Sequence, residues 1–321
     1  MQFDIITLGS ATVDVFVQPS KRELREHDGH VDVCYHVGEK VLIDDLVVDT
    51  GGGGTNAACA FARLGFRTGW IGAVGDDHNA DLVNAMLKKE RITPLGQVIP
   101  GMTGYSVVMV GLRHDRFILA YKGVNDKLSK LPPLNAKWLY MSSLTGASER
   151  LLAAAARECK KRKIKYAFNP SMYLAAQGLE ILGGVIEGAE LLILNKEEAS
   201  ALLDVVAGSA PVPQMLRDLS KIAKNVVITD GPAGAFATDG KSRFTIKPRP
   251  IKVVETTGAG DAFASGVVAG LMMGEQLSDA LCFGMAEAES VIGAVGAKNN
   301  LLNKKALQKD ALRYVVVEEA F

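Results

Sequence analysis

Asp261 is the residue of this 321-residue chain whose setting best suits catalysis. It follows Gly258, Ala259 and Gly260 directly, and a run of small apolar residues begins after it. A helix N-terminus leaves backbone N–H groups unpaired and carries a partial positive charge, and small side chains let an anion reach those groups. We therefore expect Gly258, Ala259 and Gly260 to bind a phosphate or another oxyanion, with the Asp261 carboxylate beside it.

An ionised carboxylate in that place is suited to take a proton from an alcohol as the alcohol attacks phosphorus. We expect the positive end of the helix to lower the pKa of Asp261 and so to keep it ionised. The alternative is that Asp261 is an ordinary acid in a first helical turn and that the glycines only allow close packing.

A second glycine cluster, residues 51–54, precedes another predicted helix that carries Asn56 and ends near Gly65. Four successive glycines cost much conformational entropy on folding, so we expect a ligand to lie against bare backbone at Gly52 and Gly53. The Asn56 amide offers both a donor and an acceptor to a hydroxylated ligand. A flexible surface turn is the alternative, which the apolar segments on both sides of the cluster disfavour.

Six short segments occur in a fixed order along nearly the whole chain: 9–14, 51–58, 72–77, 195–198, 229–231 and 255–263. In this order they resemble the motifs of the PfkB/ribokinase family of metabolite kinases. The resemblance implies a ribokinase-like doubly wound α/β fold and ATP- and Mg2+-dependent transfer of phosphate to a hydroxyl group.

Roles for individual residues follow from that resemblance, position by position. It implies that Asp261 is the catalytic base and that Gly258, Ala259 and Gly260 form its anion hole. The remaining matches are Asp14, Gly52, Gly53 and Asn56 for the acceptor, Asn195, Thr229 and Gly231 for the nucleotide, and Glu198 for Mg2+ through water. Asn195 and Glu198 also have the spacing of a helix capping box, and the two interpretations are compatible.

Several positions depart from the family's patterns. Glu255 stands where the family often has Asp or Asn in a monovalent-cation loop, so dependence on a monovalent cation is left open. Gly53 stands where ribokinase has a lysine, and Leu144 lies near the position of its pocket glutamate. We therefore expect phosphoryl transfer to a sugar or sugar-like metabolite, with a nucleoside as the alternative acceptor.

The elements that position these residues alternate between strand-like and helical patterns, which indicates a parallel sheet with helices on both faces. Ligands of such sheets bind beyond the carboxyl ends of the strands, where several of the motifs lie. The predicted strands are 3–8, 68–74, 137–142, 165–168, 191–194 and 226–229, and the predicted helices are 79–89, 149–163, 174–187 and 212–223.

Residues 13–50 and 104–122 interrupt the alternation with strands that have no helix between them. We expect them to form a small antiparallel lid over the site, within one kinase domain of residues 1–321; an extension of the main sheet's edge is the alternative. A lid would exclude water, which competes as the phosphoryl acceptor. Valines 31, 33, 107 and 108 are candidates for an apolar outer face, and both that face and the family resemblance favour a homodimer through the lid.

Composition excludes other classes of function. With 36 basic and 36 acidic residues, the chain has no net positive charge for nucleic acid, and no apolar run is long enough to span a bilayer. Residues 1–4 lead straight into a strand rather than a signal peptide, so we expect a cytoplasmic protein. A dinucleotide oxidoreductase would need GxGxxG after the first strand, where this chain has Gly-Ser-Ala-Thr at 9–12. A non-catalytic binding protein is disfavoured because Asp261 and its glycines are present.

The cysteines form no CxxC pair, and those within predicted helices, Cys59, Cys159 and Cys282, are expected to be free thiols. Cys34 lies close in sequence to His27, His30 and His36. Their spacing matches no common zinc pattern, so the segment is interpreted either as a metal site or as a polar loop and edge strand.

Overall fold

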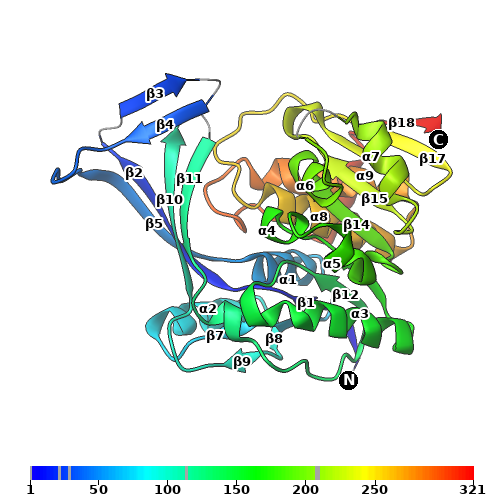
Figure 1. Cartoon of the computed structure of the whole chain (residues 1–321), viewed down its shortest axis with the longest axis horizontal. Coiled ribbons are helices and arrows are strands. Elements are labelled where there is room, and N and C mark those ends of the chain that lie inside the picture. The colour runs from blue at the N-terminus through cyan, green and yellow to red at the C-terminus, as the bar shows by residue number, and fades with distance from the viewer. Residues whose placement is uncertain (1, 21–22, 28–29, 113–114, 207–209) are drawn as a thin grey trace.

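The computed structural model describes residues 2–20, 23–27, 30–112, 115–206 and 210–321. Its centre is a ten-stranded sheet whose strands from β8 to β15 are parallel and whose far edge is antiparallel (Figure 1). In spatial order the strands are β18 (Val316–Ala320), β17 (Ser242–Ile246), β16 (Ala235–Thr238), β15 (Val226–Thr229), β14 (Leu191–Asn195), β13 (Lys165–Phe168), β12 (Ala136–Met141), β1 (Phe3–Leu8), β6 (Thr68–Ile71) and β8 (Thr93–Pro94).

Helices cover both faces of this sheet because its strands are apolar on both sides. Neighbouring strand residues face opposite ways: Ile6 and Leu139 belong to one buried cluster, Ile5 and Trp138 to the other. The first cluster packs against α3 (Arg150–Arg162), α5 (Gly178–Ile186), α6 (Lys196–Leu202) and α7 (Val212–Leu219). The second packs against α1 (Gly53–Arg63), α8 (Ala259–Met273), α9 (Leu277–Val291) and α10 (Lys304–Ala311). The predicted doubly wound α/β fold is therefore confirmed.

Some predicted boundaries were wrong. The segment expected as one helix over 174–187 is two helices, α4 (Met172–Ala175) and α5, separated where Gly178 adopts a positive φ of 75°. The strand expected over 68–74 ends at Ile71, and β7 (Ala73–Val74) pairs instead with β9 (Gln97–Val98). Helix α2 (His78–Lys89) begins one residue earlier than predicted, since the Asp77 side chain caps it.

A second sheet of four strands projects to one side of the central sheet (Figure 1). Its order is β11 (Asp115–Tyr121), β10 (Gly104–Leu112), β2 (Thr12–Pro19) and β5 (Ile43–Gly51), and we call it the lid sheet. The strands match the two predicted segments to within one residue, but the sheet is mixed: β2 and β10 run parallel, whereas the other pairs are antiparallel. Residues expected to extend it, β4 (His30–Cys34), pair instead with β3 (Glu23–His27) as a separate hairpin at its tip.

The lid sheet has two faces, which its register defines. Asp14, Ser106 and Ala120 pair across the strands and share one face, while Val15, Val107 and Leu119 share the other, which we call the outer face. The prediction that both Val107 and Val108 lie on an apolar outer face was right for Val107 and wrong for Val108, which lies on the Asp14 face and is buried. Val33 is in the tip hairpin, and the side chain of Val31 is outside the described residues.

The four cysteines are free thiols. Among the described residues no three His, Cys, Asp or Glu residues are grouped as a metal site; for His27 and His30 the structure describes the backbone but not the side chain. Among the described residues, no helix has both the length and the apolar character required to cross a bilayer.

Candidate active site

Asp261 lies in the first turn of α8, close to where the glycine motif begins the helix. Gly258 caps the helix at a left-handed φ of 81°, and a Cβ there would lie 2.5 Å from the Cβ of Ala297, so only glycine fits. The Ala259 amide donates a hydrogen bond to the Thr256 carbonyl at 3.2 Å. No carbonyl accepts from the amides of Gly260 and Asp261 in the part of the chain that the structure describes, which leaves donors suited to an anion.

The Asp261 carboxylate is held from the side by Asn56. The Asn56 Nδ2 donates to Asp261 Oδ2 at 2.8 Å, although the two residues are 205 positions apart. The expectation that the helix end lowers the pKa of Asp261 is wrong. Although the side chain opens onto a cavity, surrounding protein removes enough water to raise its pKa, against the lowering effects of Asn56 and of the charge on Lys298.

The glycine cluster at 51–54 is explained largely by contacts within the protein. A Cβ at Gly51 would lie 1.8 Å from Asp14 Oδ2, and one at Gly54 would lie 2.5 Å from the Gly9 backbone. At Gly53 it would meet Ser142 Oγ at 2.2 Å and Asp261 Oδ1 at 3.4 Å. The cluster therefore brings β2, β12 and α8 together at one point, and Gly53 alone of these three glycines also lines the cavity.

Asp14 is buried on the face of the lid sheet opposite the outer face. Its Oδ1 accepts from the Thr12 hydroxyl at 2.8 Å. Burial raises its pKa, and hydrogen bonds from Thr12 and Ser106 oppose that rise. The residue thus lies where the lid sheet meets the glycine cluster.

A cavity of about 350 Å³ runs along the carboxyl ends of the strands beside Asp261. Of the residues predicted for the site, those that line it are Gly53, Asn195, Glu198, Thr229, Gly258, Gly260 and Asp261. The predicted residues that do not line it are Asp14, Gly52, Asn56, Gly231 and Ala259. Of these, Asn56 contacts Asp261 directly and Gly231 begins a short 3-10 turn after β15.

Asn195 and Glu198 form the expected capping box at the start of α6. The Asn195 Oδ1 accepts from the Glu198 amide at 2.7 Å, and Glu198 Oε2 accepts from the Asn195 amide at 2.9 Å. Burial raises the pKa of Glu198 to about 7. A carboxylate desolvated in this way at the wall of a cavity is favoured in its charged form by a bound cation.

The sequence motifs assign no role to several residues that line the cavity. Arg116, on β11 of the lid sheet, donates from Nη1 to the Thr256 hydroxyl at 2.5 Å, which connects the lid sheet with the glycine motif. The cavity lining also includes Ser10, Asn125, Ser142 and Asn169. No motif pointed to the last three, whose places follow only from the packing of distant strand ends.

Glu255 is the residue at which the family resemblance left binding of a monovalent cation open. Its Oε1 accepts from the Thr257 amide at 2.6 Å, while the buried Oε2 has no hydrogen-bond partner among the described residues. A buried carboxylate oxygen without a donor suits a cation ligand. The residues of this loop therefore fit such a cation despite the change from Asp or Asn to Glu.

Known proteins of one family are similar to this chain in sequence and in fold. The family model described as pfkB family carbohydrate kinase matches residues 24–304. Ribokinase of Bacillus subtilis is 26% identical over 312 residues, covering 95% of this chain and 98% of that protein. Among solved structures, Arabidopsis thaliana ribokinase complexed with ribose and ATP has a TM-score of 0.79 at 20% identity, covering 97% of this chain and 99% of its own. The Methanocaldococcus jannaschii nucleoside kinase has a TM-score of 0.78 at 20% identity, with the same coverage.

Fold and site together define an ATP-dependent kinase, a phosphotransferase with an alcohol group as acceptor. The chain belongs to the pfkB family of carbohydrate kinases.

Proposed function

We propose that this protein transfers the γ-phosphate of ATP to a primary alcohol of a sugar or sugar-like metabolite, with Mg2+ as cofactor. The observation that carries the proposal is the position of Asp261. Its carboxylate lies at the wall of the cavity, beside a helix N-terminus whose Gly260 and Asp261 amides donate to no carbonyl of the described residues, and Asn56 holds it there.

In the proposed reaction Asp261 accepts the proton of the acceptor hydroxyl while the oxygen attacks the γ-phosphorus. The new oxygen–phosphorus bond forms, the bond from the γ-phosphorus to the β–γ bridging oxygen breaks, and ADP leaves with that electron pair. The amides of Gly260 and Asp261 stabilise the charge on the transferred group. Asp14 and Asn56 position the acceptor hydroxyls, and Gly53 lets the acceptor approach the backbone, whereas the protein itself packs against Gly52.

Asn195, Thr229 and Gly231 are proposed to contact the nucleotide, and Glu198 to hold Mg2+ through water. Glu198 fits this role because it lines the cavity and its pKa of about 7 leaves it readily ionised beside a cation. When bound, Mg2+ supplies positive charge that offsets the charge of the triphosphate.

A sugar is favoured over a nucleoside as the acceptor by the polar lining near Gly53. Ser142 lies against Gly53, and Ser143 and Asn169 line the same cavity, so several polar partners for hydroxyl groups are available. A nucleoside is the second candidate, since a cytidine kinase of Thermococcus kodakarensis is 25% identical over 90% of this chain.

The test is ADP release from ATP and Mg2+ across a panel of pentoses, hexoses, sugar acids and nucleosides. We expect one sugar to give far higher kcat/KM than any nucleoside. A nucleoside as the best acceptor would establish the second candidate, and turnover with neither class would refute the proposal.

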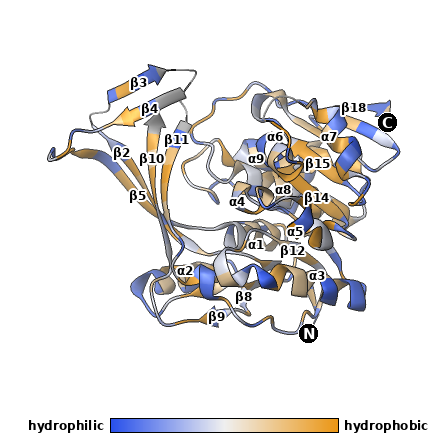
Figure 2. Cartoon of the chain, in the orientation of Figure 1, coloured by the Kyte–Doolittle hydropathy of each residue, from blue (hydrophilic) through white to orange (hydrophobic). Residues whose placement is uncertain are grey.

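We also propose that residues 1–321 form one kinase domain that dimerises through the lid. Support for one domain is that β5 leads directly into α1 at the glycine cluster. Support for the dimer comes from the lid sheet, whose strands contain many apolar residues (Figure 2), part of them on the outer face by the strand register. The most exposed members of that face are Leu46, Val48, Phe117, Leu119 and Tyr121. An apolar patch on so small a sheet is stabilised when a second copy covers it about a two-fold axis.

A further inference from the structure

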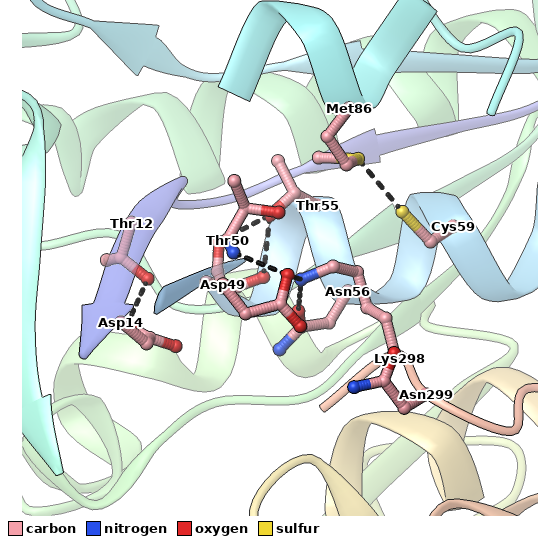
Figure 3. A network of polar contacts seen from close by, with 12 residues as sticks. Thr12, Asp14, Asp49, Thr50, Thr55, Asn56, Cys59, Met86, Lys298 and Asn299 are labelled. Atoms are coloured by element: carbon pink, nitrogen blue, oxygen red, sulfur yellow. Dashed lines mark hydrogen bonds and ion pairs between the residues drawn. The ribbon is translucent and has the colours of Figure 1, made fainter. Parts of the chain in front are cut away.

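Lys298 is a buried lysine beside the proposed base, and neither its neighbours in sequence nor any motif marks it. Only 4% of the residue is exposed. Its Nζ donates to Asn56 Oδ1 at 3.5 Å and lies 3.8 Å from Asp49 Oδ1 on β5 of the lid sheet. Figure 3 shows the ammonium group between these two side chains. Lysine is rarely buried to this degree without a partner or a function.

The two ends of the Asn56 side chain have different partners. Its Oδ1 accepts from Lys298, and its Nδ2 donates to Asp261 Oδ2 at 2.8 Å. If the amide turned over, its carbonyl would face the carboxylate and its NH2 group would face the ammonium, and both contacts would be lost. The charge on Lys298 therefore selects the orientation in which Asn56 can hold Asp261.

The backbone of Lys298 is fixed as firmly as its side chain. Arg63 donates from Nη1 to the Lys298 carbonyl at 2.7 Å, and two further hydrogen bonds hold Arg63 to Glu90. The preceding residue, Ala297, packs against Gly258. One loop thus contacts the beginning of the anion-binding helix, the partner of Asp261, and the lid sheet.

The charges around Lys298 favour an electrostatic role as well. Its ammonium lowers the pKa of both Asp261 and Asp14, whose burial raises them. The charge of Asp261 also interacts with three other titratable groups, Asp14, Tyr140 and Glu198. On its other side Lys298 lines a cavity of about 320 Å³ whose charged members are Asp49, Arg63, Lys89 and Glu90. The buried Cys59 thiol is also within its field.

We propose that Lys298 is a positioning residue for phosphoryl transfer: its ammonium orients the Asn56 amide, which holds Asp261 against the acceptor, and it keeps that carboxylate ionised. The proposal rests on the proposed role of Asp261 as the base. Without the Lys298 ammonium, Asp261 stays protonated up to a higher pH. The acidic limb of the pH–activity profile therefore moves toward neutral pH.

The test compares Lys298→Met with Lys298→Arg, which keeps the charge, and with Lys89→Met, which removes the other lysine of the same cavity. For each, kcat and KM for the acceptor are measured from pH 4.5 to 9. We expect Lys298→Met to move the acidic limb of kcat/KM upward by about one pH unit or more, and to lower kcat about tenfold or more near neutral pH. Lys298→Arg should restore most of the limb's position, and Lys89→Met should match the wild type.

Three outcomes would overturn the proposal. A Lys298→Met enzyme with lower activity but an unmoved limb would show a structural role only. A large rise in KM with kcat and the limb unchanged would show that Lys298 contacts the acceptor instead. If Lys298→Met is too unstable to assay, a shift of the acidic limb of kcat/KM in Lys298→Arg would also count against the proposal. Failure of the base assignment itself is recognised separately, because Asp261→Asn would then stay active.

Discussion

Glu287 provides a prediction whose size follows from the structure. It lies on α9 with none of its surface exposed, its Oε1 accepts from the Leu302 amide at 3.2 Å, and its Oε2 has no hydrogen-bond partner among the described residues. Burial raises its pKa from 4.5 to about 8, against the opposing charge of Arg63. Between these two values the folded protein holds a proton that the unfolded chain has released.

The sign and magnitude follow from linkage. A raised folded-state pKa gives stability that is complete below pH 4.5 and is lost as pH rises through about 8. From pH 5 to 8 the loss is at most about 4 kcal/mol, at about 1.36 kcal/mol per unit, and about 3 kcal/mol once partial ionisation at both ends is included. Glu287→Gln mimics the protonated acid, so it should not share this loss.

The assay is urea unfolding of the wild type and of Glu287→Gln at pH 5, 6, 7 and 8. The free energy of unfolding of the variant, relative to the wild type, should rise by about 3 kcal/mol across the series. Glu275→Gln, at an exposed position, is the matched control and should show no trend. A difference between Glu287→Gln and the wild type that stays constant from pH 5 to 8 would refute the reasoning.

Three further predictions concern the proposed function. Asp261→Asn should lower kcat by about two to four orders of magnitude, with ATP affinity by calorimetry close to that of the wild type, because the amide keeps the shape but cannot accept a proton; more than about a tenth of wild-type kcat would remove Asp261 from the role of base. Glu198→Gln should need more Mg2+ for half-maximal activity and be partly rescued by millimolar excess, whereas an unchanged Mg2+ titration would leave Glu198 as a helix cap only. Leu119→Glu on the outer face of the lid sheet should give monomers in light scattering at micromolar concentration, while Leu312→Glu at an exposed site elsewhere should not; a wild type that is active and strictly monomeric would contradict the dimer.

The parts of the fold that sequence predicts well are those in which local pattern and tertiary role agree. The strands at 3–8 and 191–194 are mostly apolar because both of their faces are buried, and their type was therefore clear. The antiparallel strands β16, β17 and β18 were not predicted, since the short β16 lies close after a 3-10 turn and β18 is mostly exposed. The break at Gly178 was missed because a single glycine is also compatible with an uninterrupted helix.

The sequence predicted those residues of the candidate site whose side-chain chemistry requires one residue type within a motif. Asp261 and Asn56 stand in motifs and meet in space. Arg116 and Lys298 belong to no motif, and their places depend on how the lid sheet and the 296–299 loop pack on the body, which no local pattern encodes. The direction of the Asp261 pKa was wrong for the same reason: desolvation is set by neighbours distant in sequence.

The way the lid sheet is attached to the body bears on ATP hydrolysis in the absence of an acceptor. Its strands β2 and β5 reach the body at the glycine cluster, where Thr12 pairs with Gly51 and a Cβ at Gly51 would lie 1.8 Å from Asp14 Oδ2. On the proposed function, an acceptor held by Asp14 would contact the lid sheet at the end where the sheet joins the body. A rotation of the sheet about that end would move the β3–β4 tip most, so acceptor binding and exclusion of water would be linked, and the enzyme without an acceptor would hydrolyse little ATP.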